Sequence, residues 1–168
     1  MDTAPIKLLI LDVDGVLTDG RLVFGPDGEI SKTFHARDGC ALKLWGASGG
    51  KIAILSGRSH QALPPRAKEL GIELVHTGIA DKLAAYDTIL TEASCGDDNV
   101  AYVGDDYPDM GPMRRCAFPV AVANASPSVK RISWYVTKLR GGRGAVAEVI
   151  ELLLRGQGRW TKPLLKSV

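Results

Sequence analysis

Two aspartates two positions apart, Asp12 and Asp14, directly follow the apolar residues 8–11. A carboxylate can attack phosphorus and form an aspartyl phosphate. A second carboxylate two residues on can protonate the leaving alkoxide and then activate water. The pair therefore indicates phosphoryl transfer, although an Asp-x-Asp-Gly turn after a strand is common and is a weak motif by itself.

Further polar side chains occur where later apolar runs of the chain end, after residues 51–55, 73–76 and 99–103. They are Ser56, Lys82, Asp105 and Asp106, with Asp109 one turn further on. In open α/β sheets, ligands bind beyond the carboxyl ends of the strands. We therefore expect all these groups to converge on one rim of a sheet.

The combination of groups predicts a particular chemistry. Crowded carboxylates repel one another and need a cation, and oxygen-only ligands suit Mg²⁺. A hydroxyl such as Ser56 and an ammonium such as Lys82 are donors suited to a phosphoryl group. The sequence therefore predicts a Mg²⁺-dependent site for a phosphorylated small molecule.

Simpler interpretations exist for each residue taken alone. Ser56 could cap a helix, Lys82 could be a solvated helix residue, and Asp106 and Asp109 could cap the helix after their strand. A signalling receiver domain also places acidic residues, a hydroxyl and a lysine around Mg²⁺, but it stores the phosphoryl group. Its phospho-accepting aspartate typically ends a mid-chain strand, whereas Asp12 follows the first strand. A non-catalytic regulatory subunit is a third alternative, which the complete set of motif residues disfavours.

The order and spacing of these motifs resemble those of the haloacid dehalogenase superfamily of phosphatases. The resemblance implies that Asp12 is the nucleophile and Asp14 the general acid/base. It implies that Mg²⁺ is held by the Asp12 carboxylate, the Asp14 backbone carbonyl and Asp105. Ser56 and Lys82 would complete the catalytic set by binding the phosphoryl group, with Asp106 and Asp109 in supporting positions around the metal.

Other segments narrow the resemblance to the 3-deoxy-D-manno-octulosonate 8-phosphate phosphatases, a capless family of that superfamily. The segments are residues 34–39, 56–58 and 141–146, together with Arg66. The resemblance implies a phosphorylated sugar acid as substrate, an intermediate of lipopolysaccharide synthesis. The substrate-binding positions that it implies are Asp14, His35, Ala36, Arg37, Asp38, Gly39, Lys43, Arg58, Arg66 and Lys82.

This sequence departs from the family pattern at three places. His35-Ala36 stands where Asn-Val is common, Cys40-Ala41 where Tyr-Gly is common, and Lys43 where arginine is familiar. A second sugar-acid substrate, a nine-carbon nonulosonate 9-phosphate, therefore stays open beside the eight-carbon one.

Apolar runs alternate along the chain with segments of helical periodicity, and these segments indicate the strands and helices that must position the polar residues. Strands are predicted near residues 7–11, 51–55, 73–76, 99–103, 118–122 and 134–136, with helices between them. Unbroken apolar runs are typical of parallel strands buried on both faces. This pattern predicts one doubly wound α/β domain over residues 1–168, with a β-hairpin over 21–35, no cap domain and a flexible tail from about 156.

Length and composition set limits on the function. The chain has 168 residues, a net charge of +2 and three cysteines without CxxC spacing. The near balance of charge predicts no nucleic-acid partner, and the absence of a long apolar run predicts no membrane span. The cysteine pattern indicates a reducing compartment, and we expect a cytoplasmic protein.

The predicted hairpin carries apolar Leu22, Val23, Phe24 and Ile30. A lone two-stranded hairpin is marginal in water. Packing against hairpins of other copies would bury these residues, and the family resemblance implies a homotetramer built in this way.

Overall fold

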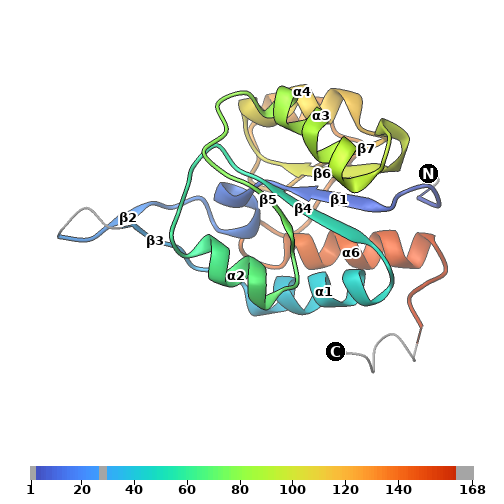
Figure 1. The fold of residues 1–168 in the computed structure, drawn as a ribbon, viewed down its shortest axis with the longest axis horizontal. Helices are drawn as coiled ribbons and strands as arrows, with labels where there is room; N and C mark the ends of the chain where they lie inside the picture. The colour runs from blue at the N-terminus through green and yellow to red at the C-terminus, as the bar shows by residue number, and fades with distance from the viewer. Residues whose placement is uncertain (1–2, 27–29, 162–168) are drawn as a thin grey trace.

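A six-stranded parallel sheet forms the centre of the molecule (Figure 1). The computed structural model describes residues 3–26 and 30–161. The strand order is β5-β4-β1-β6-β7-β8, which runs outward in both directions from β1 and confirms the doubly wound fold. The strands are β1 (Leu8–Leu11), β4 (Lys51–Leu55), β5 (Leu74–His76), β6 (Val100–Gly104), β7 (Phe118–Ala121) and β8 (Tyr135–Val136).

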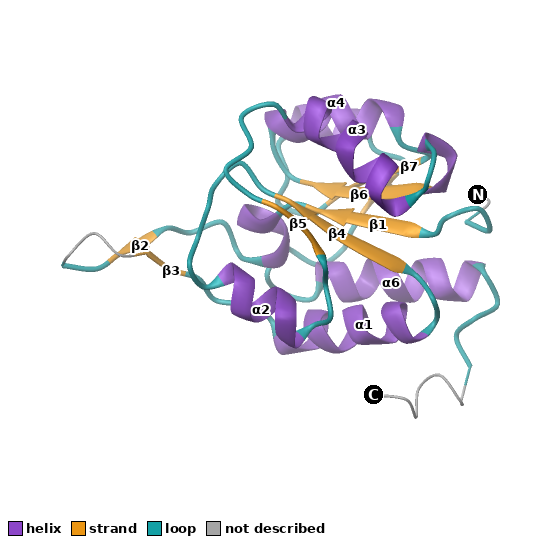
Figure 2. Ribbon diagram, in the orientation of Figure 1, coloured by secondary structure: helices purple, strands orange, loops and turns teal. Residues whose placement is uncertain are grey.

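Helices cover both faces of the sheet, which explains why its central strands are apolar at consecutive positions (Figure 2). Every residue of β1, β6 and β7 is buried. Helix α1 packs against α6 on one face, near α2, and α3 and α4 lie together on the other face. The helices are α1 (Ala36–Ala47), α2 (Leu63–Glu69), α3 (Lys82–Ala93), α4 (Met110–Arg115), α5 (Pro127–Ile132) and α6 (Ala145–Gly156).

The predicted hairpin is present but is shorter than residues 21–35. Strands β2 (Val23–Phe24) and β3 (Ile30–Ser31) pair antiparallel over two residues each. The hairpin projects from the end of the sheet at which β1 terminates (Figure 1). Val23 is 59% and Phe24 65% exposed. The turn residues 27–29 lie outside the described part of the chain.

The predicted flexible tail begins as an ordered segment. Helix α6 continues to Gly156, and the Gln157 side chain then donates hydrogen bonds to the carbonyls of Thr3 and Ile6, each at 2.8 Å. The Arg159 amide donates to the Leu154 carbonyl at 2.8 Å. Residues 162–168 lie outside the described part.

No helix within residues 3–26 and 30–161 is long and apolar enough to cross a membrane.

Candidate active site

A cavity of about 360 Å³ opens beyond the carboxyl ends of β1, β4 and β6. It brings together eight of the predicted site residues: Asp12, Asp14, Ser56, Arg58, Lys82, Asp105, Asp106 and Asp109. The sheet order explains this convergence, because β4 and β6 flank β1 on its two sides. The rim predicted from the ends of the strands is therefore present.

A tight turn, η1 (Val13–Leu17), carries the chain out of β1 and was not predicted from the sequence; the Thr18 amide closes it by donating to the Val13 carbonyl, and the backbone at Asp14 and Gly15 is not helical. The Asp12 amide donates to the Val103 carbonyl of β6 at 3.1 Å, so Asp12 is held at the very end of the strand. Gly15 follows with a φ of +97°, where a side chain would be strained and would collide with the Asp105 carboxylate. This turn sets Asp12 and Asp14 beside Asp105.

The segment before α6 supports the same turn from behind. A Cβ atom on Gly141 would collide with the Gly15 carbonyl, and the Gly142 amide donates to the Val16 carbonyl at 2.9 Å. The Gly141 amide in turn donates to Oδ1 of Asn124 at 2.8 Å. The glycine-rich residues 141–144 therefore pack against the η1 turn.

Lys82 provides the central positive charge of the cavity. It is the first residue of α3, whose start is capped by Asp81 through the amides of Leu83 and Ala84. Its Nζ donates to Oδ1 of Asp12 at 2.7 Å and to Oδ1 of Asp109 at 2.8 Å. Burial alone lowers the pKa of Lys82, but the two carboxylates outweigh it and raise that pKa. Lys82 is therefore charged at neutral pH.

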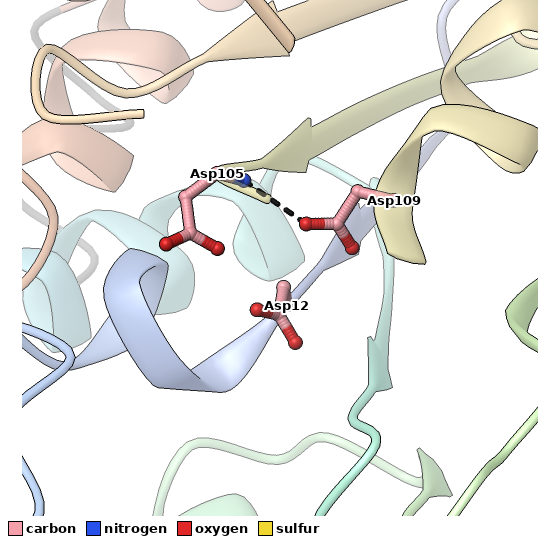
Figure 3. A group of neighbouring side chains, drawn as sticks. All are labelled: Asp12, Asp105 and Asp109. Carbon is pink, nitrogen blue, oxygen red and sulfur yellow. Dashed lines mark hydrogen bonds between the residues drawn. The ribbon is translucent and has the colours of Figure 1, made fainter. Parts of the chain in front are cut away.

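Three carboxylates, from Asp12, Asp105 and Asp109, have oxygens within 4.8 Å of one another (Figure 3). Burial, with Asp109 adding to it, raises the pKa of Asp12 to about 6. Burial, with Asp12 and Asp109 adding to it, raises the pKa of Asp105 to about 8. This crowding of negative charge, by oxygen donors alone, fits a hard divalent cation such as Mg²⁺.

Asp109 accepts hydrogen bonds at both of its carboxylate oxygens. Its Oδ1 accepts from Lys82 and from the Tyr102 hydroxyl at 2.8 Å. Its Oδ2 accepts from the Asp105 and Asp106 amides at 3.0 and 3.2 Å. Both oxygens are therefore occupied by hydrogen bonds that fix the loop after β6, so Asp12 and Asp105 are the carboxylates of this group that could hold a cation.

Ser56 and Arg58 lie on the opposite side of the cavity, after β4. Ser56 is buried, and its Oγ accepts from the Arg58 amide at 3.3 Å. The Arg58 side chain is exposed at the mouth of the cavity. A hydroxyl deep in the cavity and a guanidinium at its mouth are both suited to an anionic substrate.

One residue at the site, Lys32, was not predicted from the sequence. Lys32, directly after β3, forms an ion pair with Asp14. The two residues are 18 positions apart, and the hairpin lies between them. Only the return of the hairpin to the η1 turn brings them together, and no local pattern indicates it.

Several predicted substrate-binding residues line a different cavity of the same chain. Ala36, Gly39, Lys43 and Arg66 border a groove of about 1060 Å³ that is also lined by residues of β4 and β5. None of them borders the cavity of Asp12. Their part in substrate binding therefore stays a prediction.

Three further predicted substrate-binding residues, His35, Arg37 and Asp38, have other contacts within this chain. Asp38 is buried, and its oxygens accept from the Gly144 and Ala147 amides at 3.3 and 2.8 Å, so its side chain holds the start of α6. Arg37 lies next to Gly144. His35 precedes α1 and borders a small apolar pocket with Arg66. Within one chain, Arg37 and Asp38 therefore lie at the start of α6, and none of these three side chains borders the cavity of Asp12.

Comparisons with known proteins find relatives that match most of this chain. The family model of haloacid dehalogenase-like hydrolases matches residues 72–150. The 3-deoxy-D-manno-octulosonate 8-phosphate phosphatase of Yersinia pestis is 43% identical over 156 residues, which cover 93% of this chain and 83% of that protein. The enzyme of the same name from Escherichia coli K12 is 44% identical over 154 residues, with 92% of this chain and 82% of that protein covered.

Solved structures show the same likeness. The crystal structure of the 3-deoxy-D-manno-octulosonate 8-phosphate phosphatase from Moraxella catarrhalis has a TM-score of 0.94 and 36% identity. The match covers 98% of this chain and 94% of that one. That structure contains a magnesium ion, a phosphate ion and a KDO molecule.

Proposed function

Since the chain belongs to the 3-deoxy-D-manno-octulosonate 8-phosphate phosphatases of the haloacid dehalogenase-like hydrolases, we propose that it hydrolyses 3-deoxy-D-manno-octulosonate 8-phosphate in this cavity, with Mg²⁺. The observation that carries the proposal is the placement of Asp12, Asp14, Lys82 and Asp105 around one cavity. The receiver alternative is set aside, because Asp14 borders the same cavity and supplies the base that hydrolysis requires.

In the first step, a carboxylate oxygen of Asp12 attacks phosphorus and the bond to the sugar oxygen breaks. Protonated Asp14 gives its proton to that oxygen, so the sugar acid leaves as an alcohol. A bound Mg²⁺ would lower the pKa of Asp12 and offset charge on the phosphoryl oxygens. Asp12 and Asp105 are the side chains that would hold the ion, together with the Asp14 carbonyl that the family resemblance implies.

In the second step, ionised Asp14 takes a proton from water, and the water oxygen attacks phosphorus. The bond between phosphorus and Asp12 breaks, phosphate leaves and both carboxyl groups return to their starting states. Lys82 and Ser56 stabilise the charge on the equatorial oxygens in both steps. Because Lys82 is already held by Asp12 and Asp109, its ammonium needs little rearrangement to do so.

A phosphate-release assay on two substrates tests this function. The protein is assayed with 3-deoxy-D-manno-octulosonate 8-phosphate and with a nine-carbon nonulosonate 9-phosphate, each with Mg²⁺ and with excess EDTA. We expect a higher kcat/KM for the eight-carbon acid and loss of turnover in EDTA. A preference for the nine-carbon acid would support the alternative substrate, and no turnover of either acid would refute the proposal.

A homotetramer with the hairpins at its centre is part of the proposal. Two observations support it: the exposure of Val23 and Phe24, and the placement of Lys43 and Arg66 on a groove away from the catalytic carboxylates. In an assembly, this groove of one subunit can face the cavity of another. The predicted sugar-acid contacts would then come from a neighbouring subunit.

We also propose that the enzyme acts in the cytoplasm, in lipopolysaccharide synthesis. The three cysteines Cys40, Cys95 and Cys116 are free thiols, which agrees with a reducing compartment.

A further inference from the structure

Lys32 has an unusual environment for a lysine of a projecting hairpin. Its side chain is only 3% exposed, and its ammonium group donates to Oδ1 of Asp14, which is 20% exposed. Asp14 borders the catalytic cavity, whereas Lys32 is not among the residues that line it. Lys32 therefore contacts the Asp14 carboxylate without lining the cavity itself, and we expect an effect on a substrate there to pass through Asp14.

The charges around the cavity are divided between distinct partners. Lys82 pairs with Asp12 and Asp109, and Asp105 faces the predicted cation position. Among the described residues, the ion pair of Asp14 is with Lys32. A buried ammonium or carboxylate without a counter-charge is costly, so this pair holds both groups in one place.

We propose that Lys32 is a positioning residue that holds the Asp14 carboxylate toward the leaving oxygen of the substrate and apart from the carboxylates of Asp12 and Asp105. The proposal rests on the proposed phosphatase function. Because Lys32 directly follows β3, the pair also ties the hairpin to the turn that carries the acid. With Oδ1 of Asp14 held by Lys32, Oδ2 is the oxygen that carries the proton to the leaving group, so Lys32 supports the orientation of the acid.

The test compares substrates whose leaving groups differ in their need for a proton. kcat/KM reports the steps up to departure of the leaving group, because that departure is the first irreversible step. Departure of a sugar alkoxide needs Asp14, whereas p-nitrophenolate leaves without protonation. Lys32→Met keeps the buried aliphatic chain but removes the charge, and Lys32→Arg keeps the charge. Lys7→Met, at an exposed site at the start of β1, serves as the matched control.

We expect Lys32→Met to lower kcat/KM for the sugar-acid phosphate by about 30-fold or more, while p-nitrophenyl phosphate changes by less than about threefold. Lys32→Arg should recover part of the loss, and Lys7→Met should match the wild type. An equal loss on both substrates would overturn the proposal, because it would indicate general damage to the fold. Unchanged kcat/KM on both would also overturn it.

A double-mutant cycle separates action through Asp14 from direct contact with the sugar acid. If Lys32 acts through Asp14, adding Lys32→Met to Asp14→Asn should change kcat/KM by less than about threefold. A further loss equal to that of the single variant would overturn the proposal. Either result for Lys32 leaves the wild-type turnover unaffected, so failure of this inference is distinct from failure of the proposed function.

Discussion

The ammonium of Lys82 lies 2.7 Å from Oδ1 of Asp12, although 70 positions separate the two residues in the chain. Asp12 directly follows β1, and Lys82 begins α3 on the other side of the cavity. The contact places a fixed positive charge directly beside the proposed nucleophile. It lowers the pKa of Asp12 and so partly offsets burial, which with Asp109 still raises that pKa to about 6, and it marks where a phosphoryl group would bind.

Lys82→Met should abolish most activity and weaken the fold. Loss of a preorganised charge at the transition state typically costs about 10²–10³-fold in kcat. Removal of one partner of a buried charge cluster costs about 3–5 kcal/mol in the free energy of unfolding. Phosphate release and urea denaturation check the two effects, with Lys138→Met as an exposed control. Wild-type kcat in the folded variant would contradict the role of Lys82.

Asp14→Asn should lose turnover of the sugar-acid phosphate while it still binds the substrate. An amide can neither donate the proton to the leaving oxygen nor remove one from water. Isothermal titration calorimetry with Mg²⁺ and substrate measures the binding, and phosphate release measures the turnover. Undiminished turnover would exclude the acid/base role of Asp14.

Stability without metal should depend on pH through Asp12 and Asp105. Burial and neighbouring carboxylates raise the pKa values of these groups to about 6 and about 8, above the ordinary 3.8. Both groups therefore bind protons more tightly in the folded state. Their contribution to the free energy of unfolding is fully present below the ordinary pKa of 3.8 and is lost as the pH rises above it, through about 6 for Asp12 and about 8 for Asp105.

A cation should replace this lost stabilisation, so Mg²⁺ should raise the Tm more at about pH 8 than at about pH 5.5. Differential scanning calorimetry at the two pH values, with and without Mg²⁺, measures the difference. In Asp105→Asn, which removes a carboxylate from the group, the Mg²⁺ effect should shrink at the higher pH. An equal or larger shift at the lower pH in the wild type would contradict the assignment.

Replacement of Val23 and Phe24 with glutamate should produce smaller species with weaker activity. The charges would oppose burial of the hairpin against other copies, and the groove containing Arg66 would no longer meet a neighbouring cavity. Light scattering and a phosphate-release assay on the same sample measure both properties. A fully active monomer would refute the proposed assembly.

The elements best predicted from the sequence are those defined by burial on two faces. Strands such as β1 and β6 are short unbroken apolar runs, so their positions and their parallel arrangement can be predicted from the order of apolar residues along the chain. The η1 turn and the short α4 and α5 have no such periodicity, because their shape depends on contacts with distant segments. The packing of Gly141 against Gly15 is one such contact.

The same distinction applies to the candidate site. Asp12, Ser56 and Asp105 were predictable because each follows a strand, and parallel strands share one rim. Lys32 was not, because its partner is fixed by the return path of the hairpin. Arg66 shows a third case: its residue type suits the substrate, but its position in one chain does not reach the catalytic cavity.

The most direct test of the account is the initial rate of phosphate release from 3-deoxy-D-manno-octulosonate 8-phosphate, with Mg²⁺, by the wild type and by Asp12→Asn. An amide at residue 12 cannot form the acyl phosphate and is a poorer ligand for the cation. We expect the wild type to release phosphate and the folded variant to be slower by about 10³-fold or more, a loss of about 4 kcal/mol. A variant that retains activity within about tenfold of the wild type, about 1.4 kcal/mol, would contradict Asp12 as the nucleophile.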